Sequence, residues 1–135
     1  MPDKVKDWMS SPVVVVDADS SVSYALTLMR RRSIHSLVVV MGDEKPVYGI
    51  LTTTDIRDKI IIAERNPAEM RVREVMTSPV VIADPAWSLR ECSLKMHATG
   101  IHHMPVADEH GVLVGMISVT DIFRAAEEIG WGREK

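Results

Sequence analysis

The sequence predicts a mixed α/β (α+β) fold built from two β-α-β-β-α repeats, and three observations support this prediction. The stretch GILTTTDI at residues 49–56 returns as GMISVTDI at residues 115–122. The front of the chain also aligns with itself, because residues 5–22 match residues 72–89 at an offset of 67. Finally, short apolar runs alternate with segments whose apolar residues have helical spacing, and the order is the same in both copies. A tandem duplication explains all three observations.

The first elements of each repeat are a brief strand and a helix. Apolar runs follow a proline at residues 13–16 and 80–83, and such runs are typical of short buried strands. The next segments have apolar residues at helical spacing and a serine near their start. These apolar positions are Val22, Ala25, Leu26 and Met29 in the first copy and Leu89, Cys92 and Met96 in the second.

Two strands and a second helix complete each repeat. The β-rich runs 37–41 and 47–53 are separated by GDEKP, and the runs 104–107 and 112–118 by DEHG, which predicts two hairpins. The final helices are expected over residues 55–64 and 121–128. The matches in this part of the repeat fall at an offset of 66, so one residue was lost in the turn.

The repeats are expected to divide the chain at residues 1–67 and 68–135. A unit of about 60 residues has a small core, so we expect the two copies to pack together about a pseudo-two-fold axis as one structural domain. That arrangement predicts two equivalent clefts between the copies, where a ligand can sense how they are disposed.

Composition and charge narrow the class of protein. The chain has 135 residues, of which 46% are hydrophobic and 26% charged, which is typical of a soluble globular protein. No apolar run approaches the roughly 18 residues of a membrane span, and no export signal is recognised, so a cytoplasmic protein without a membrane partner is expected. The net charge is −3 and no basic stripe is present, which argues against nucleic acid as a partner.

The repeated stretch places a hydroxyl residue and an acid at the junction of a strand and a helix. Thr52 and Ser118 stand where a helix N-cap is expected, and Asp55 and Asp121 fall in the first turn, where a negative charge is favourable. A capping role explains this pattern completely. The functional alternative is that free backbone N–H groups bind phosphate while the carboxylate accepts two ribose hydroxyls.

Taken together, these residues resemble a pair of CBS motifs, the tandem module called a Bateman domain. The resemblance covers residues 5 to 128 and rests on VREVMTSPVV, GIHHMPVADEHGVLVG and MISVTDI. It implies binding of an adenosyl compound (AMP, ADP, ATP or S-adenosylmethionine) without another cofactor. It also implies that the bound state is reported to another protein.

The resemblance assigns roles to residues of both repeats. It implies that Asp55 and Asp121 bind the ribose hydroxyls, and that Thr52, Thr54, Ser118 and Thr120 meet the phosphate or the outer ribose. Met9 and Val14 are expected to face the adenine of the site with Asp121, and Met76 and Val81 that of the site with Asp55. The basic or polar positions before the second strand are His35, Ser36, His102 and His103.

The two copies also differ at positions that shape these sites. Val38 and Ser33 of the first copy stand where the second has Pro105 and Gly100. Unequal affinities are therefore expected.

Other residues have competing interpretations. His97, His102, His103 and His110 lie near Cys92, but no metal-binding spacing is present and no metal site is expected. Cys92 is interpreted as a core residue. Residues 30–32 are three arginines that either complement a helix C-terminus or reach a polyphosphate. Trp8 and Trp131 either pack normally or mark an oligomer contact.

The sequence therefore predicts a stand-alone regulatory sensor of adenine nucleotides and not an enzyme, since no catalytic arrangement is recognised. It is expected to form a homodimer and to act on an unidentified regulated protein or through self-association. The alternatives are an interaction or structural module without a ligand, or a binder of S-adenosylmethionine or metal.

Overall fold

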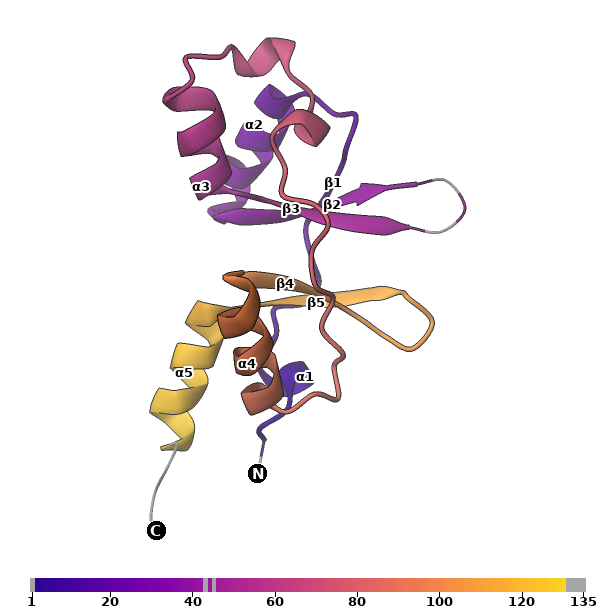
Figure 1. Cartoon of the computed structure of the whole chain (residues 1–135), viewed down its shortest axis with the longest axis vertical. Helices are drawn as coiled ribbons and strands as arrows, with labels where there is room; N and C mark the ends of the chain where they lie inside the picture. Colours follow the sequence, from indigo (N-terminus) through magenta and orange to yellow (C-terminus); the bar gives the residue numbers. More distant parts are fainter. Residues whose placement is uncertain (1, 43, 45, 131–135) are drawn as a thin grey trace. The chain divides into compact units, whose positions relative to one another are not determined.

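The computed structural model describes residues 2–42, 44 and 46–130, and its two structural units do not coincide with the two sequence repeats (Figure 1). One unit is continuous and contains residues 14–80. The other joins the N-terminal segment, up to residue 13, to the part of the chain that follows residue 80. The N-terminal segment of the first repeat thus belongs to the unit that contains most of the second repeat, and the start of the second repeat, up to residue 80, belongs to the continuous unit.

The continuous unit has a three-stranded sheet with helices packed beside it (Figure 1). The strands lie in the order β1 (Val15–Asp17), β2 (Ser36–Met41) and β3 (Val47–Thr52). β1 is parallel to β2, and β2 pairs antiparallel with β3, so the predicted hairpin is confirmed. The helical segments are α2 (Val22–Arg32), α3 (Thr53–Ile56), a π-helix (Arg57–Ile61) and two short 3₁₀ helices, Pro67–Glu69 and Val72–Glu74.

The predicted helix after β1 is confirmed, and its ends follow from the sequence. The Ser21 hydroxyl accepts a hydrogen bond from the Tyr24 backbone N–H at 3.1 Å and caps α2. Val22, Ala25 and Met29 form the buried side of the helix. The helix ends at Ser33, whose φ of 54° is left-handed. Its last turn carries the three arginines, where their charge complements the helix dipole.

The discontinuous unit repeats much of this architecture. Its elements are α1 (Val5–Trp8), α4 (Leu89–Thr99), β4 (His103–Ala107), β5 (Leu113–Ser118) and α5 (Val119–Ile129). β4 and β5 form the predicted antiparallel hairpin. α4 begins with a capping box between Ser88 and Glu91 and ends at Gly100, whose φ of 69° favours glycine.

The predicted strand at residues 80–83 is wrong, because only one bridge forms there, between Ala83 and Val106. In the continuous unit, the Val38 N–H donates to the Val14 carbonyl at 3.2 Å and extends the parallel pairing. The equivalent of Val38 is Pro105, which has no N–H to donate. The ladder therefore shrinks to the bonds that Ala83 makes with Pro105 and Ala107, at 2.9 and 3.1 Å.

The predicted helix over residues 55–64 is confirmed only in part. It begins as α3 and continues as the π-helix Arg57–Ile61, in which the Ile62 N–H donates to the Arg57 carbonyl at 2.9 Å. Single π turns of this kind occur often at functional sites. Its counterpart α5 is a regular α-helix and contains the whole of the predicted range 121–128.

Each unit has its own hydrophobic core. The core of the continuous unit includes Leu37, Leu51 and Ile60, and that of the other unit includes Leu89 and Cys92. Cys92 is fully buried, so its interpretation as a core residue is confirmed, and burial raises the pKa of its thiol to about 11.

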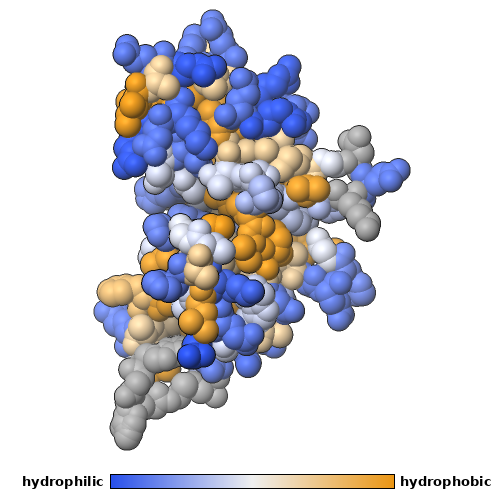
Figure 2. Space-filling model, in the orientation of Figure 1, coloured by the Kyte–Doolittle hydropathy of each residue, from blue (hydrophilic) through white to orange (hydrophobic). Residues whose placement is uncertain are grey.

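Apolar side chains are also exposed in both units. Ile61 and Ile62 are 67% and 69% exposed, and Phe123 on α5 is 67% exposed. Figure 2 shows hydrophobic residues at the surface among hydrophilic ones. Among the described residues, no helix is both long and apolar enough to cross a membrane.

Candidate functional site

The two repeated stretches form the same capped junction, as predicted. Thr52 and Ser118 are extended residues, with φ of −124° and −128°, and each is the N-cap of the helix that follows. Each hydroxyl accepts from the backbone N–H of the aspartate three residues later, at 3.3 Å for Asp55 and 3.4 Å for Asp121. Each carboxylate reaches back to the cap N–H, so both junctions are capping boxes formed by a buried acid.

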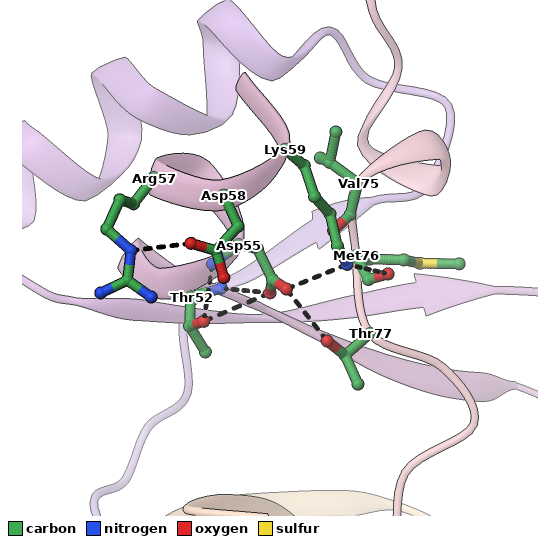
Figure 3. A network of polar contacts seen from close by, with 8 residues as sticks. All are labelled: Thr52, Asp55, Arg57, Asp58, Lys59, Val75, Met76 and Thr77. Atoms are coloured by element: carbon green, nitrogen blue, oxygen red, sulfur yellow. Dashed lines mark hydrogen bonds and ion pairs between the residues drawn. The ribbon is translucent and has the colours of Figure 1, made fainter. Parts of the chain in front are cut away.

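Asp55 lies at the centre of a polar network in the continuous unit (Figure 3). Its Oδ2 accepts from the Thr52 N–H at 3.0 Å and from the Thr52 hydroxyl at 3.2 Å. Its Oδ1 accepts from the Lys59 ammonium at 3.1 Å and from the Thr77 hydroxyl at 3.0 Å. The residue is only 6% exposed, so these four donors compensate for the loss of water around a buried charge.

Lys59 connects this network to the backbone that follows the 3₁₀ helix Val72–Glu74 (Figure 3). Its ammonium donates to the Val75 carbonyl at 2.8 Å and to the Met76 carbonyl at 3.4 Å. The ammonium therefore connects Asp55, at the start of α3, to the backbone of Val75 and Met76, which lie 16 and 17 residues after Lys59.

Asp121 has a different set of partners in the discontinuous unit. Its Oδ2 accepts from the Ser118 N–H at 2.8 Å and from the Ser118 hydroxyl at 3.2 Å, as in the first junction. Its Oδ1 accepts from Nη2 of Arg124 at 2.7 Å. The Arg124 guanidinium lies 6.0 Å from the centre of the Trp8 ring, within the range of a cation–π interaction.

The predicted methionine neighbours lie close to the two strands that lead into the capped junctions. Thr77, the residue after Met76, pairs with Ile50 of β3, and Ser10, the residue after Met9, pairs with Met116 of β5. Gly49 and Gly115 allow this close approach. A Cβ on Gly115 would meet the Met9 sulfur at 2.5 Å, and one on Gly49 would meet the Met76 sulfur at 3.2 Å. Met9 thus lies in the unit of Asp121, and Met76 in the unit of Asp55.

The polar residues predicted before the second strand also lie near the caps. Ser36 is the cross-strand partner of Thr52, and His103 is the partner of Ser118. The carbonyls of the residues before them, His35 and His102, accept the first helical N–H groups, those of Thr53 and Val119, at 3.1 and 3.0 Å.

His35 lines a hollow in the continuous unit, and His102 lines one in the other unit. In the continuous unit His35 shares it with Arg30, Thr53 and Ile56 among others. In the other unit His102 shares an equivalent hollow with residues that include His97. Each hollow has a volume of about 470 Å³.

The remaining predicted residues lie on the helix surfaces or against the hydrophobic cores. Thr54 and Thr120 are exposed on the first turns of their helices. Val14 packs against the core of the unit that contains Asp55, and Val81 against the core of the unit that contains Asp121. Their assignment to an adenine stays a prediction.

Sequence reasoning missed the three side chains that donate to Oδ1 of the two aspartates, which are Lys59, Thr77 and Arg124. Lys59 follows Asp55 by four positions and Arg124 follows Asp121 by three, both of which are spacings for neighbours on a helix surface. That rule applied to the sequence would have identified both cations. Thr77 lies 22 residues from Asp55 and gives no local signal.

Comparison with known proteins identifies the family to which the chain belongs. The family model described as "CBS domain" matches residues 5–62 and again residues 72–128. The chain therefore belongs to the CBS domain family and carries a tandem pair of these domains.

A sequence relative shows that such pairs also occur within larger proteins. The chain is 31% identical over 124 residues to homoserine O-acetyltransferase of Methanohalobium evestigatum. The match covers 92% of this chain and 24% of that enzyme. The similarity therefore concerns the CBS region and does not extend to the activity of the whole enzyme.

Solved structures share the fold over almost the whole chain. The hexameric CBS-CP12 protein from bloom-forming cyanobacteria is 29% identical, with a TM-score of 0.90, and the match covers 99% of this chain and 74% of that one. The CBS domain pair of protein MJ0100, in complex with 5′-methylthioadenosine and S-adenosyl-L-methionine, is 26% identical with a TM-score of 0.80. That match covers 93% of this chain and 97% of that one.

Proposed function

We propose that this CBS domain pair is a regulatory sensor that binds adenine nucleotides (AMP, ADP or ATP) through Asp55 and Asp121. The observation that carries the proposal is the repeated capped junction. It presents a buried carboxylate at the same place in both units, with one oxygen held by the cap and the other held by side chains.

A nucleotide ribose fits the chemistry of these junctions. Its vicinal hydroxyls donate two hydrogen bonds, and a carboxylate is an acceptor with two oxygens that can receive both. Hydrogen bonds to a charged acceptor are stronger than neutral ones. Thr52 and Ser118, followed by Thr54 and Thr120, supply hydroxyls for the phosphate or the outer ribose.

Residues around the junctions are assigned to the rest of the ligand. Met9 and Met76 offer polarisable surfaces to the adenine, and Val14 and Val81 complete the predicted adenine contacts. His35, Ser36, His102 and His103 are proposed as neighbours of the phosphate.

A second candidate ligand shares the same nucleoside. S-Adenosylmethionine is favoured by the complex of the MJ0100 domain pair, which holds S-adenosyl-L-methionine and 5′-methylthioadenosine. Both candidates use the ribose and adenine contacts and differ only beyond the 5′ carbon.

We further propose that the protein regulates and does not catalyse, and that it does so as a homodimer. The exposed apolar side chains Ile61, Ile62 and Phe123 support self-association, since solvated apolar surface is covered when copies meet. A ligand transmits a signal only if it binds two arrangements of the protein with different affinity. The regulated protein would bind one of these two arrangements better than the other.

Isothermal titration with AMP, ATP, S-adenosylmethionine and GTP tests the proposal. Asp55→Asn and Asp121→Asn are the matched variants, because the amide keeps an acceptor for the cap N–H and loses the charge. Adenosyl compounds are expected to bind and GTP is not. Each variant should weaken its own site about 10- to 100-fold, the effect of losing a hydrogen bond to a charged group. Absence of heat from every ligand, after bound nucleotide has been extracted, would overturn the proposal.

A further inference from the structure

The two ribose-binding aspartates of the proposed function differ in how fully their oxygens are occupied. A carboxylate offers about four acceptor positions. Asp55 already accepts four hydrogen bonds, two from Thr52, one from Lys59 and one from Thr77. Asp121 accepts three from described residues, two from Ser118 and one from Arg124. A ribose diol, which needs two acceptor positions, therefore meets a saturated group at Asp55.

The difference arises at Oδ1, the oxygen that the cap does not use. At Asp55 two donors must leave before a diol can bind, whereas at Asp121 only Arg124 must leave. The sequence explains why the second copy has fewer donors. Ala125 stands at the position equivalent to Lys59, and Ser10 at that equivalent to Thr77. Within the described residues, neither makes a hydrogen bond to Asp121.

The donors also differ in how strongly other groups hold them. The Lys59 ammonium has three acceptors, because the Val75 and Met76 carbonyls receive its other protons (Figure 3). Those carbonyls keep the ammonium beside Asp55 even if the ion pair stretches. Among the described residues, the Arg124 guanidinium has a cation–π contact with the Trp8 ring in place of such carbonyl acceptors, and a ring takes up no N–H group in the way that a carbonyl does, so these groups are available for a phosphate.

We infer that Lys59 and Thr77 form an internal lock on Asp55, so that a ribose-bearing ligand binds first at Asp121. The inference rests on the proposed function and deepens it, because it ranks the two sites and names the residues that set the rank. The site of Asp55 fills only when the ligand displaces both donors from Oδ1.

Adenosine is the probe that isolates this lock. It carries the ribose diol and no phosphate, so any change in its binding reports competition for the carboxylate and not attraction between Lys59 and an anion. 2′-Deoxyadenosine lacks one of the two hydroxyls and serves as the control ligand. The full chain with Asp121→Asn leaves the site of Asp55 as the one to be measured.

In this background Lys59→Met removes the ammonium while keeping an unbranched side chain, and Thr77→Val removes the hydroxyl with little change in shape. Each is expected to tighten adenosine binding about tenfold, the effect of no longer breaking one hydrogen bond to a charged group. Binding of 2′-deoxyadenosine should gain far less. Lys95→Met is the matched control, since its ammonium lies 5.9 Å from the centre of the Trp87 ring and contacts neither aspartate.

The outcomes separate the lock from the proposed function. If the natural chain binds AMP and neither variant gains adenosine affinity, the lock is refuted and the sensor stands. An equal gain for both nucleosides, or for Lys95→Met, also refutes it. If no form of the chain binds adenosine or AMP, both proposals fail. Thermal denaturation shows whether Lys59→Met is folded. If it is not, Thr77→Val tests the same lock, because Thr77 also donates to Oδ1 of Asp55.

Discussion

Gly115→Ala should destabilise the protein, because this glycine lies where the N-terminal segment crosses β5. The added Cβ would meet the Met9 sulfur at 2.5 Å, the Met9 Cγ at 2.9 Å and the Ser10 carbonyl oxygen at 2.9 Å. The methionine side chain can move, but the Ser10 carbonyl cannot, because Ser10 exchanges backbone hydrogen bonds of 2.8 and 3.0 Å with Met116.

The expected size follows from these contacts. Overpacking of this kind costs about 1–3 kcal/mol, while replacing glycine by alanine recovers roughly 0.4–1 kcal/mol through the unfolded chain. We expect Gly115→Ala to lower the free energy of unfolding by about 1–2 kcal/mol. Gly49→Ala is the matched control. Its nearest contacts, the Thr77 carbonyl at 3.0 Å and the Met76 sulfur at 3.2 Å, are looser, so it should cost less than about 1 kcal/mol.

Urea denaturation followed by circular dichroism measures both changes. Combining Gly115→Ala with Met9→Ala then divides the cost, because the double variant relieves the contact with sulfur and leaves that with the Ser10 carbonyl. The two substitutions together should cost less than the sum of their separate effects. If Gly115→Ala unfolds at the same urea concentration as the natural chain, or Gly49→Ala is the more damaging change, the steric reasoning is refuted.

Two further predictions concern the core and the assembly. Burial raises the pKa of the Cys92 thiol from its ordinary value of 9.0 to about 11 in the folded state. The unfolded chain therefore releases this proton at a lower pH than the folded chain. The free energy of unfolding falls between those two pH values, by at most about 1.4 kcal/mol per pH unit. Urea titrations at pH 8.5 and 10.5 should show a larger loss for the natural chain than for Cys92→Ala, and an equal loss would contradict the burial argument. Light scattering during size-exclusion chromatography should give the mass of a dimer, and Phe123→Asp should reduce it to that of a monomer if the exposed apolar residues form the contact. A dimer that is unchanged by this substitution would place the interface elsewhere.

Much of the fold could be predicted because local chemistry determines it. The serine caps, the alternating turns and the apolar runs located α2, α4 and both hairpins. The prediction failed where a partner strand decided the outcome. Residues 80–83 have the composition of a strand, but the neighbouring strand β4 contains Pro105, which lacks the N–H that the equivalent Val38 donates to Val14. The residue that shortens the ladder therefore lies outside residues 80–83, and their own composition gives no sign of it.

The candidate site, like the fold, could be predicted where its residues are close in sequence. The capping hydroxyls and the aspartates were predictable because they are close in sequence and because the pattern occurs twice. Lys59 was within reach of the same reasoning, since its spacing from Asp55 is that of neighbouring residues on a helix. Thr77 was not, because its contact with Asp55 depends on how the chain returns to β3 after the 3₁₀ helices.

The discontinuous unit has a consequence for how the chain folds as it is synthesised. Residues 14–80 are contiguous, so that unit can fold once they have left the ribosome. The N-terminal segment emerges earlier and yet must wait for partners that follow residue 80. Val5, which is fully buried in the later unit, spends that interval exposed. For the same reason a fragment covering residues 14–80 keeps the contacts of the continuous unit. A fragment covering the first sequence repeat, residues 1–67, would contain the N-terminal segment without its partners. It would also lose the 3₁₀ helices that complete the unit of Asp55.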